Sequence, residues 1–555
     1  MNRILLTGVL ALAPLLAPLA QERSERIEDT WNLSAIFATP DEWAAAVDAL
    51  EARVPEIEAC EGRLAESAEA LLECSTLISD VYREYGQVAS YASMSSDADT
   101  RVAENQQRRS RAQILGNKLA QATAFISPEV LEAGAGRMNA LLEAEPALEP
   151  YRQSIRDTLR QAEHTLDEDG EQLLAANSLV QATAFNTYRT LSNADMPWPT
   201  ITLSDGTEVR LDQAAYTKYR AAENRDDRKA VFDAFWGKWK EFERTYGTTL
   251  SGLLNNHVFS ARARNYDTTL AAALDGSNIP PAVYTTLLEE VNASLPTLHR
   301  YFTLRGRMLG VEQPAYFDIY PPLVELDKEF PLEVGKRLSL ESAAPLGPAY
   351  AEVMAHGLEN RWMDAYPRPG KVSGAYMSPG AAFDVHPFIL MNYNDDYESV
   401  STLAHEWGHA MHTYLATKSQ PYPTSSYSIF TAEIASTFNE ALLLDHMLRQ
   451  AQNDQERLYY LGSALENLRG TFYRQAMFAE YELAIHEAAE RGEPLDGAKF
   501  TEMYADIVRR YHGHDQGVMT VDDLYVAEWA YVPHFHYNFY VYQYATSYVA
   551  AIALA

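Results

Sequence analysis

Two imidazoles and a carboxylate lie close together in the segment His405-Glu406-Trp407-Gly408-His409. The surrounding residues 399–415 continue an amphipathic helical pattern, and helical residues four positions apart lie on one face, one turn from each other. This spacing lets both imidazoles reach one metal ion, and a catalytic zinc normally takes three protein ligands and a water. Glu406 would then act as a general base on that water rather than as a ligand. The segment therefore predicts a catalytic metal site with one further protein ligand.

His412 lies on the same helical face, but geometry argues against it as the third ligand. It follows His405 by about 10.5 Å along a helix axis, whereas two ligands of one zinc lie only about 4 Å apart. His412 is therefore expected to support a ligand or to pack.

The third ligand is predicted from the next helical pattern, residues 429–444. That run is largely apolar and contains Glu433 and Glu440, and a buried carboxylate is costly unless it is paired or bound to metal. We assign Glu433 as the ligand and expect Glu440 to be a partner of a ligating histidine or an arginine. The alternative for Glu433 is an ordinary carboxylate near the start of a helix, interacting with the helix dipole.

Together with other motifs, these residues resemble the M3 family of zinc peptidases, and within it the oligoendopeptidase F branch. The resemblance extends from about residue 28 to the end of the chain. It is carried by the segments 371–376, 386–393, 405–412, 430–436 and 533–546.

The resemblance implies a fold class and an activity. The fold would be mainly α, a two-lobed, multi-helix metallopeptidase with a deep substrate channel and a small β-sheet near the helix that carries His405. The activity would be that of a zinc-dependent metalloendopeptidase, with one Zn²⁺ per chain, that cleaves internal bonds of short unfolded peptides. His405, His409 and Glu433 would be the zinc ligands, and Glu406 the catalytic base.

A second group of catalytic residues is expected near the end of the chain. Peptide hydrolysis needs a hydrogen-bond donor for the developing oxyanion, and Tyr537, Tyr544 and Tyr548 fall near one helical stripe. The resemblance implies that His534, Tyr537 and Tyr544 face the zinc. Tyr540 and Tyr542 remain alternatives for the tyrosine role, and all of these tyrosines could instead be core aromatics.

The resemblance also suggests a substrate-binding strand. Residues 388–393 are expected to form an edge strand that lines the cleft and pairs with the main chain of an extended peptide. The residues assigned to substrate binding are Gly374, Ala375, Phe388, Leu390, Asn392 and Tyr542.

Composition excludes one class of partner and suggests more than one lobe. The chain has 555 residues and a net charge of −32. Nucleic acid is a poor partner, because binding phosphates requires a basic surface, and the charge is expected to serve solubility. A chain of this length can bury a large core and should form more than one lobe.

The first twenty residues are typical of a secretory signal peptide. Arg3 supplies a positive charge, residues 4–19 are uncharged, and Ala20 precedes a polar stretch. We expect an exported protein, periplasmic or secreted, with no membrane association after cleavage; the alternative is an uncleaved N-terminal anchor. An oxidising compartment would allow Cys60 and Cys74 to form a disulfide, and the alternative is that they are two small buried apolar residues.

The sequence is organised into mostly helical stretches. Amphipathic patterns predict helices over 41–60, 63–95, 99–125, 129–141, 144–163, 213–263 and 283–308. Residues 200–203 and 208–211 resemble a β-hairpin around Ser204-Asp205-Gly206. We predict an N-terminal helical lobe over 21–200 and a catalytic domain over 201–555. The helical pattern at Ala555 ends without a cap, as expected of a chain that is truncated there.

Other activities fit parts of the pattern. An exopeptidase or another metal-dependent amidohydrolase would use the same histidine pair. A catalytically silent peptide-binding protein would have a disrupted ligand set, and the intact His405, Glu406, His409 and Glu433 argue against it. The pattern predicts no oligomeric state and no cleavage preference.

Overall fold

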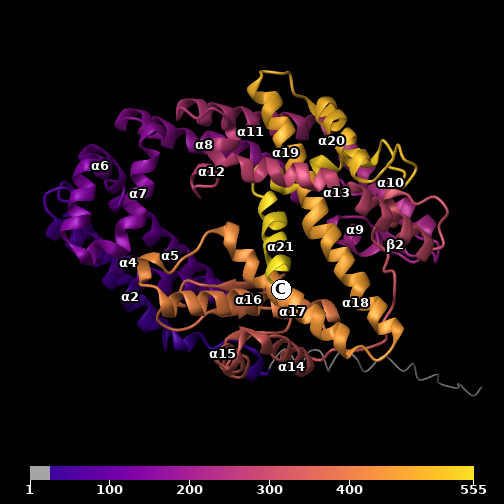
Figure 1. Cartoon of the computed structure of the whole chain (residues 1–555), viewed down its shortest axis with the longest axis horizontal. Helices are drawn as coiled ribbons and strands as arrows, with labels where there is room; N and C mark the ends of the chain where they lie inside the picture. Colours follow the sequence, from indigo (N-terminus) through magenta and orange to yellow (C-terminus); the bar gives the residue numbers. More distant parts are fainter. Residues whose placement is uncertain (1–25) are drawn as a thin grey trace, which may run out of the picture. The chain divides into compact units, whose positions relative to one another are not determined.

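The computed structural model describes residues 26–555, and most of them are helical (Figure 1). The strands form two small sheets, one of two strands and one of three, within the described part. The predicted mainly α fold is therefore confirmed. The predicted signal peptide lies outside the described residues. Among the helices that the structure describes, none has the length and apolar character needed to cross a membrane.

The chain forms two compact units, and each combines stretches that are distant in sequence. Unit 1 contains the chain up to Glu129, Gly136–Arg152 and Lys328–Ser426. Unit 2 contains Val130–Ala135, Gln153–Asp327 and Tyr427–Ala555. The predicted division has a single boundary near residue 200, whereas the chain passes between the units several times.

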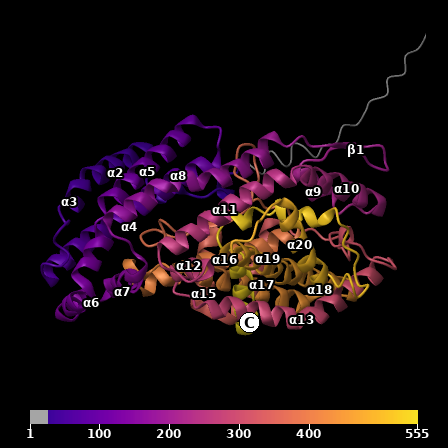
Figure 2. The same cartoon turned by 90° about the horizontal axis from the view of Figure 1, so that it is seen from above.

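Unit 1 begins with helices that share an apolar core. Helices α2, α4 and α5 run side by side (Figure 2) and bury Trp43, Val81, Val88 and Leu115 against one another. Cys60 and Cys74 are joined in a disulfide, which is the pairing that an oxidising compartment would allow, and not two free buried cysteines. The elements of unit 1 are α2 (Pro40–Ala52), α3 (Val54–Glu58), α4 (Ala68–Ala98), α5 (Ala103–Ala122), most of α6 (Ile126–Ala144), α14 (Leu332–Ser342), α15 (Pro348–Glu359), β3 (Met363–Asp364), β4 (Tyr376–Ser378), β5 (Phe388–Leu390) and α16 (Tyr397–Ser419), with short 3-10 helices at Ile27–Asp29, Leu33–Ala35, Pro146–Tyr151, Ala344–Leu346 and Tyr422–Thr424.

The three-stranded sheet corrects one prediction. Its strand order is β3-β5-β4, with β5 parallel to β3 and antiparallel to β4. The predicted edge strand at 388–393 is therefore wrong, because β5 is the central strand and its main chain is paired on both sides. Phe388 and Leu390 on one face are 0% exposed and Ile389 on the other is 1% exposed, as expected of a strand with two covered faces. The two edge strands are β3 and β4, and β4 packs against α16.

Helix α16 is fixed at its start and along its buried face. The Asp396 side chain accepts a hydrogen bond from the Ser399 N–H at 2.7 Å, which caps the helix. Trp407 is fully buried and stacks on Trp362, with ring centres 6.1 Å apart. In α15, a Cβ at Gly357 would lie 2.3 Å from the Trp407 ring. The absence of a side chain at Gly357 therefore lets α15 approach α16 closely.

Unit 2 is helical apart from one hairpin, which confirms the predicted turn. Strand β1 pairs antiparallel with β2, and Gly206 in the turn has φ 87°. The elements of unit 2 are α7 (Arg152–Arg160), α8 (Glu168–Thr190), β1 (Thr200–Thr202), β2 (Glu208–Arg210), α9 (Gln213–Tyr219), α10 (Arg225–Glu241), α11 (Glu243–Ala263), α12 (Thr269–Asp275), α13 (Pro281–Met308), α17 (Ile429–Gln450), α18 (Asp454–Asn467), α19 (Arg474–Glu490), α20 (Gly497–Tyr511) and α21 (Tyr542–Leu554), with 3-10 helices at Gln161–His164, Tyr316–Asp318, Tyr525–Ala530 and Pro533–His536 and π-helical turns at Leu191–Asp195 and Leu468–Tyr473.

The C-terminal aromatic segment is not one continuous helix. Asn538 and Phe539 have φ 50° and 61°, which is the left-handed region, and α21 begins only at Tyr542. The predicted helical stripe through Tyr537 and Tyr544 is therefore wrong, because Tyr537 precedes the left-handed turn. Helix α21 packs along α17 (Figure 1), and the Ser547 hydroxyl donates to the Phe430 carbonyl at 2.9 Å.

Candidate metal centre and active site

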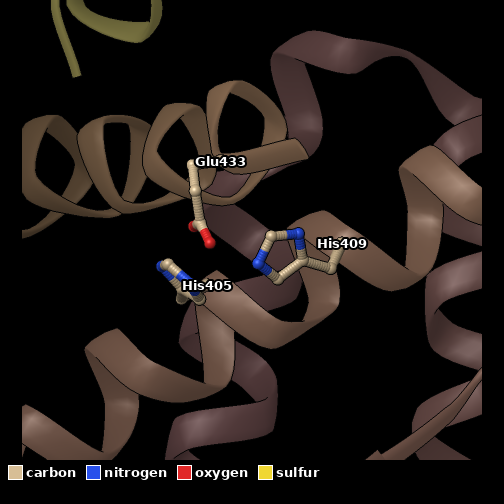
Figure 3. A group of neighbouring side chains, drawn as sticks. All are labelled: His405, His409 and Glu433. Carbon is tan, nitrogen blue, oxygen red and sulfur yellow. The ribbon is translucent and has the colours of Figure 1, made fainter. Parts of the chain in front are cut away.

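Three side chains that the sequence analysis singled out converge in the structure. His405 and His409 project from α16 and Glu433 from α17, and their imidazoles and carboxylate point toward one another (Figure 3). One potential ligand atom from each residue lies within 4.8 Å of the other two. The two imidazole ring centres are 4.9 Å apart. All three residues are half-buried.

The chemistry of this group fits a zinc ion. Two neutral imidazoles and one carboxylate are a known ligand set for catalytic zinc, which leaves a fourth position for water. Among the described residues, this is the one group of histidine, cysteine and acidic side chains whose atoms are close enough to share a metal. His412 does not belong to it, and the burial of His412, with His409 nearby, lowers the pKa of its imidazole.

Glu406 is placed as expected of a base next to a ligand. It lies on α16 between the two histidines and is 5% exposed. Its neighbours Ala404 and Trp407 are buried in the core, so the backbone at this position is held firmly. A carboxylate in such a site can hold a proton at a defined place.

The Glu433 carboxylate is oriented by its own helix. The Ser436 hydroxyl donates to Glu433 Oε2 at 2.9 Å. Glu440, two turns further on, accepts a hydrogen bond from the Asn467 amide at 2.8 Å. Hydrogen bonds of this kind fix the direction of a ligating side chain.

The predicted donors gather in one aromatic cluster despite the break in the helix. The His534 ring centre lies 5.4 Å from Tyr537, 6.2 Å from Tyr540 and 6.3 Å from Tyr544. Burial raises the pKa of Tyr544, and Tyr540 and Glu433 raise it further. Tyr544 therefore keeps its proton at neutral pH and can donate. Helix α21, which carries Tyr544, packs along α17, which carries Glu433.

The lowered pKa of His534 also suits it to a donor role. Burial lowers the pKa of His534, and the positive charge of Arg474 lowers it further. The imidazole is therefore neutral at neutral pH and can donate one hydrogen bond. Tyr542, in contrast, is 1% exposed and packs against Tyr284 and Phe430, so it is a core residue and not a substrate contact.

A buried glutamate that the sequence analysis missed holds the loop of this cluster. Glu482 on α19 is 0% exposed, and its Oε1 accepts the Phe539 N–H at 2.6 Å. The bond stabilises the left-handed turn between Tyr537 and Tyr540. Glu482 lies in an apolar helical run, so the argument that pointed to Glu433 would also have pointed here.

The segment before β4 is held by a buried lysine, Lys371, which is a further residue that the sequence analysis did not single out. Its ammonium donates to Asp364 Oδ1 at 2.6 Å, the Tyr366 carbonyl at 2.8 Å and the Met391 carbonyl at 2.5 Å. Burial lowers the pKa of Lys371 to about 8. No physical signal in the sequence distinguishes this lysine from a surface one.

The predicted substrate residues divide between the surface and the core. Gly374 is exposed and has φ 85°, a conformation that glycine adopts at little cost. Its carbonyl accepts from the Asn392 amide at 2.7 Å, and Ala375 is half-buried. Gly374, Ala375 and Asn392 remain candidates, whereas the side chains of Phe388 and Leu390 are enclosed in the core.

Most of the chain is similar to known proteins. Residues 218–555 match the model of peptidase family M3, and residues 129–197 match the model described as oligopeptidase F. The chain is 39% identical to the oligopeptidase PepF of Bacillus subtilis, over 96% of this chain and 79% of that protein.

Solved structures agree with this placement. A crystal structure from Chlamydophila abortus is similar with a TM-score of 0.87 and 32% identity, covering 96% of this chain and 89% of that one. The oligoendopeptidase F of Enterococcus faecium is similar with a TM-score of 0.69 and 30% identity, covering 93% and 87%. The fold, the family match and these relatives agree, and the chain belongs to peptidase family M3, as a metallopeptidase of the oligoendopeptidase F type.

Proposed function

We propose that this chain is a zinc-dependent oligoendopeptidase that hydrolyses internal bonds of short unfolded peptides. The observation that carries the proposal is the convergence of His405, His409 and Glu433 beside the buried Glu406. His405, His409 and Glu433 would hold one zinc ion. When bound, zinc supplies Lewis acidity that favours deprotonation of water and polarises a carbonyl.

Glu406 performs the proton transfers in this proposal. Its carboxylate accepts a proton from the attacking water as the C–O bond to the scissile carbonyl carbon forms. The same carboxyl group then delivers that proton to the amide nitrogen as the C–N bond breaks. The products are a free carboxylate and a free amine, and Glu406 returns to its starting state.

The aromatic cluster stabilises the negative charge that develops on the carbonyl oxygen. Tyr544 is the first choice of donor, because it is protonated and its helix packs along the helix that carries Glu433. His534 and Tyr540 lie within 6.3 Å of its ring, centre to centre, and support or share the role. Removing one donor to an oxyanion typically costs about 100–1,000-fold in kcat.

An extended peptide is the substrate form that the fold can align. Strand β4 is at the edge of its sheet and packs against α16, and Thr413 on α16 contacts Met377 at 3.9 Å. A peptide could add to β4 by main-chain hydrogen bonds, with side chains pointing alternately to either face. In this proposal β4, and not β5, is the strand that pairs with the substrate. Main-chain pairing requires an unfolded substrate.

Export is proposed for the location of the enzyme, either to the periplasm or into the medium. The support is the N-terminal sequence pattern and the Cys60–Cys74 disulfide, since structural disulfides persist in oxidising compartments. Retention by an uncleaved N-terminal segment is the alternative.

Metal removal and restoration test the proposed function. The purified chain is stripped with a chelator and assayed on a peptide of about ten residues with both ends blocked. We expect internal cleavage to stop and to return with one equivalent of zinc. An enzyme that keeps full activity without metal would contradict the zinc mechanism, and one that cuts only peptides with free ends would be an exopeptidase.

A further inference from the structure

Unit 2 contains a cavity that opens next to the catalytic aromatic cluster. Its volume is about 420 Å³, within the range of small-molecule sites. His534 and Tyr537 line it at one side, and Phe185, Tyr188 and Tyr531 contribute aromatic walls. The proposed catalysis uses His534 but leaves the rest of this cavity without a role.

The charged groups that line the cavity are all basic. Two arginines and no carboxylate are among its lining residues. Arg474 already has partners within the protein. Its guanidinium pairs with the buried Glu528 at 2.5 Å and donates to the Tyr316 hydroxyl at 3.4 Å. Its charge is therefore neutralised within the core.

Arg189 is the guanidinium left to act on a ligand. It lies in the last turn of α8, is exposed, and has no ion pair among the residues that the structure describes. Its guanidinium carbon is 5.8 Å from the centre of the Phe185 ring, which also lines the cavity. A guanidinium binds a carboxylate through two parallel hydrogen bonds, which makes it suited to this type of ligand.

A second observation concerns the main chain of a ligand. Gln475 lines the same cavity, and its amide nitrogen donates to the Gly470 carbonyl at 3.3 Å. Its amide oxygen is buried and has no hydrogen-bond partner within the described residues. A buried acceptor without a partner is costly, so a small rotation of the Gln475 side chain that turned this oxygen toward the cavity would let the N–H of a peptide bond satisfy it.

We propose that this cavity is a substrate subsite that binds a carboxylate of the peptide on Arg189, close to the bond that is cleaved. The carboxylate belongs to an acidic side chain or to the C-terminus of the peptide. The inference rests on the proposed function and specifies the substrate class: peptides with a negative charge near the scissile bond are preferred over neutral ones.

A matched series of peptides tests the proposal on the zinc-loaded enzyme. One cleavable sequence is made with Glu or Gln at each position flanking the scissile bond, and with a free or an amidated C-terminus. Because a hydrogen bond to a charged group is stronger than one between neutral groups, we expect a preference in kcat/KM of about 10- to 100-fold for one acidic member. A preference in the Glu/Gln pairs assigns a side chain, and one in the acid/amide pair assigns the C-terminus.

Variants then connect the preference to the cavity. Arg189→Gln should bring the acidic-to-neutral ratio of kcat/KM to about one, and Arg189→Lys should restore part of it. Arg244→Gln removes another exposed positive charge, one that does not line the cavity, and should leave the ratio unchanged. The melting temperature of each variant shows whether it is folded.

Binding without turnover gives a second readout. Calorimetry with Glu406→Gln, alone and combined with Arg189→Gln, measures the affinity for the acidic and neutral peptides. The inference is overturned if the wild type cleaves peptides without a carboxylate preference, or if the preference survives in Arg189→Gln. Failure of the wild type to cleave any blocked peptide contradicts the proposed function instead.

Discussion

The residues that perform the chemistry depend on a few local arrangements. The helical period of α16 brings His405 and His409 to one face and leaves Glu406 buried beside them. Glu433 is oriented by Ser436, one turn away on its own helix. Each of these arrangements joins residues within about one helical turn of each other, so the helical period is enough to bring them together.

The role of Glu406 can be separated from that of the ligands. Glu406→Gln keeps the size and polarity of the side chain but removes the proton acceptor. We expect the variant to fold, to bind zinc at one equivalent, and to lose about 100- to 10,000-fold in kcat. Elemental analysis and peptide cleavage are the measurements. A kcat near that of the wild type would remove Glu406 from the mechanism.

The ligand set is tested by comparing the proposed ligand Glu433 with His412, the histidine near the site that is not assigned as a ligand. Loss of a residue that only supports a ligand typically lowers metal affinity by about 10- to 100-fold. Glu433→Ala should lower zinc affinity by more than this. His412→Ala should stay within or below that range, because His412 is outside the converging group. Competitive titration with a chelating dye gives both affinities. The opposite order would exchange the roles of the two residues.

At the scale of elements, the loop before α21 separates Tyr537 from the helix that carries Tyr544. Its two left-handed residues place Tyr537 outside the helix, and Glu482 holds the turn from another helix. Asparagine adopts this conformation comparatively easily, whereas phenylalanine does not. The cost of the left-handed conformation at Phe539 must therefore be offset by contacts with its surroundings, which include the hydrogen bond to Glu482.

Glu482 should make stability dependent on pH. Burial raises its pKa to about 8, so the folded protein keeps a proton that the unfolded chain releases near the ordinary pKa of 4.5. The contribution to stability is complete below about pH 4.5 and falls between there and pH 8, by up to about 1.4 kcal/mol per pH unit. Glu482→Gln keeps an acceptor for Phe539 and never ionises, so its stability relative to wild type should rise across this window.

Urea unfolding of the metal-free protein at pH 5 and pH 8 measures this difference. Glu487→Gln on the same helix is the control, because Glu487 is exposed and should give no such change. A difference between wild type and Glu482→Gln that is the same at both pH values would show that the carboxyl does not carry the effect.

The comparison of sequence and structure shows which features are local. Helices α16 and α17 and the hairpin follow from periodicity and turn residues. The order β3-β5-β4 depends on pairing between distant segments, so the edge position was assigned wrongly. The run Phe388-Ile389-Leu390 did contain the signal, since continuous apolar residues favour a strand with both faces covered. The bond from Glu482 to Phe539 spans 57 residues, and nothing in the sequence indicates Phe539 as the partner of this glutamate.

For the molecule as a whole, the proposed function requires the substrate to reach the site as an extended chain. We predict that one cleavable sequence is cut as a free peptide and as a peptide with blocked ends, but survives as a surface loop of a stable domain. Pairing with β4 requires an unfolded segment, and unfolding a stable domain costs about 5–15 kcal/mol. Mass spectrometry of the products gives the three rates. Equal rates for the loop and the peptides would contradict this restriction.

The way the chain returns to unit 1 has a consequence for its synthesis. The Asn32 N–H donates to the Arg361 carbonyl and the Ala365 N–H to the Asp29 carbonyl, both at 2.8 Å, and Trp31 packs with Phe388 and Leu390. The first helices therefore leave the ribosome more than 300 residues before the strand that covers Trp31. At about 5–20 residues per second, this delay is on the order of tens of seconds. During that time the nascent chain presents an uncovered apolar surface around Trp31 and Met94, and slow translation before residue 388 prolongs its exposure to chaperones and proteases.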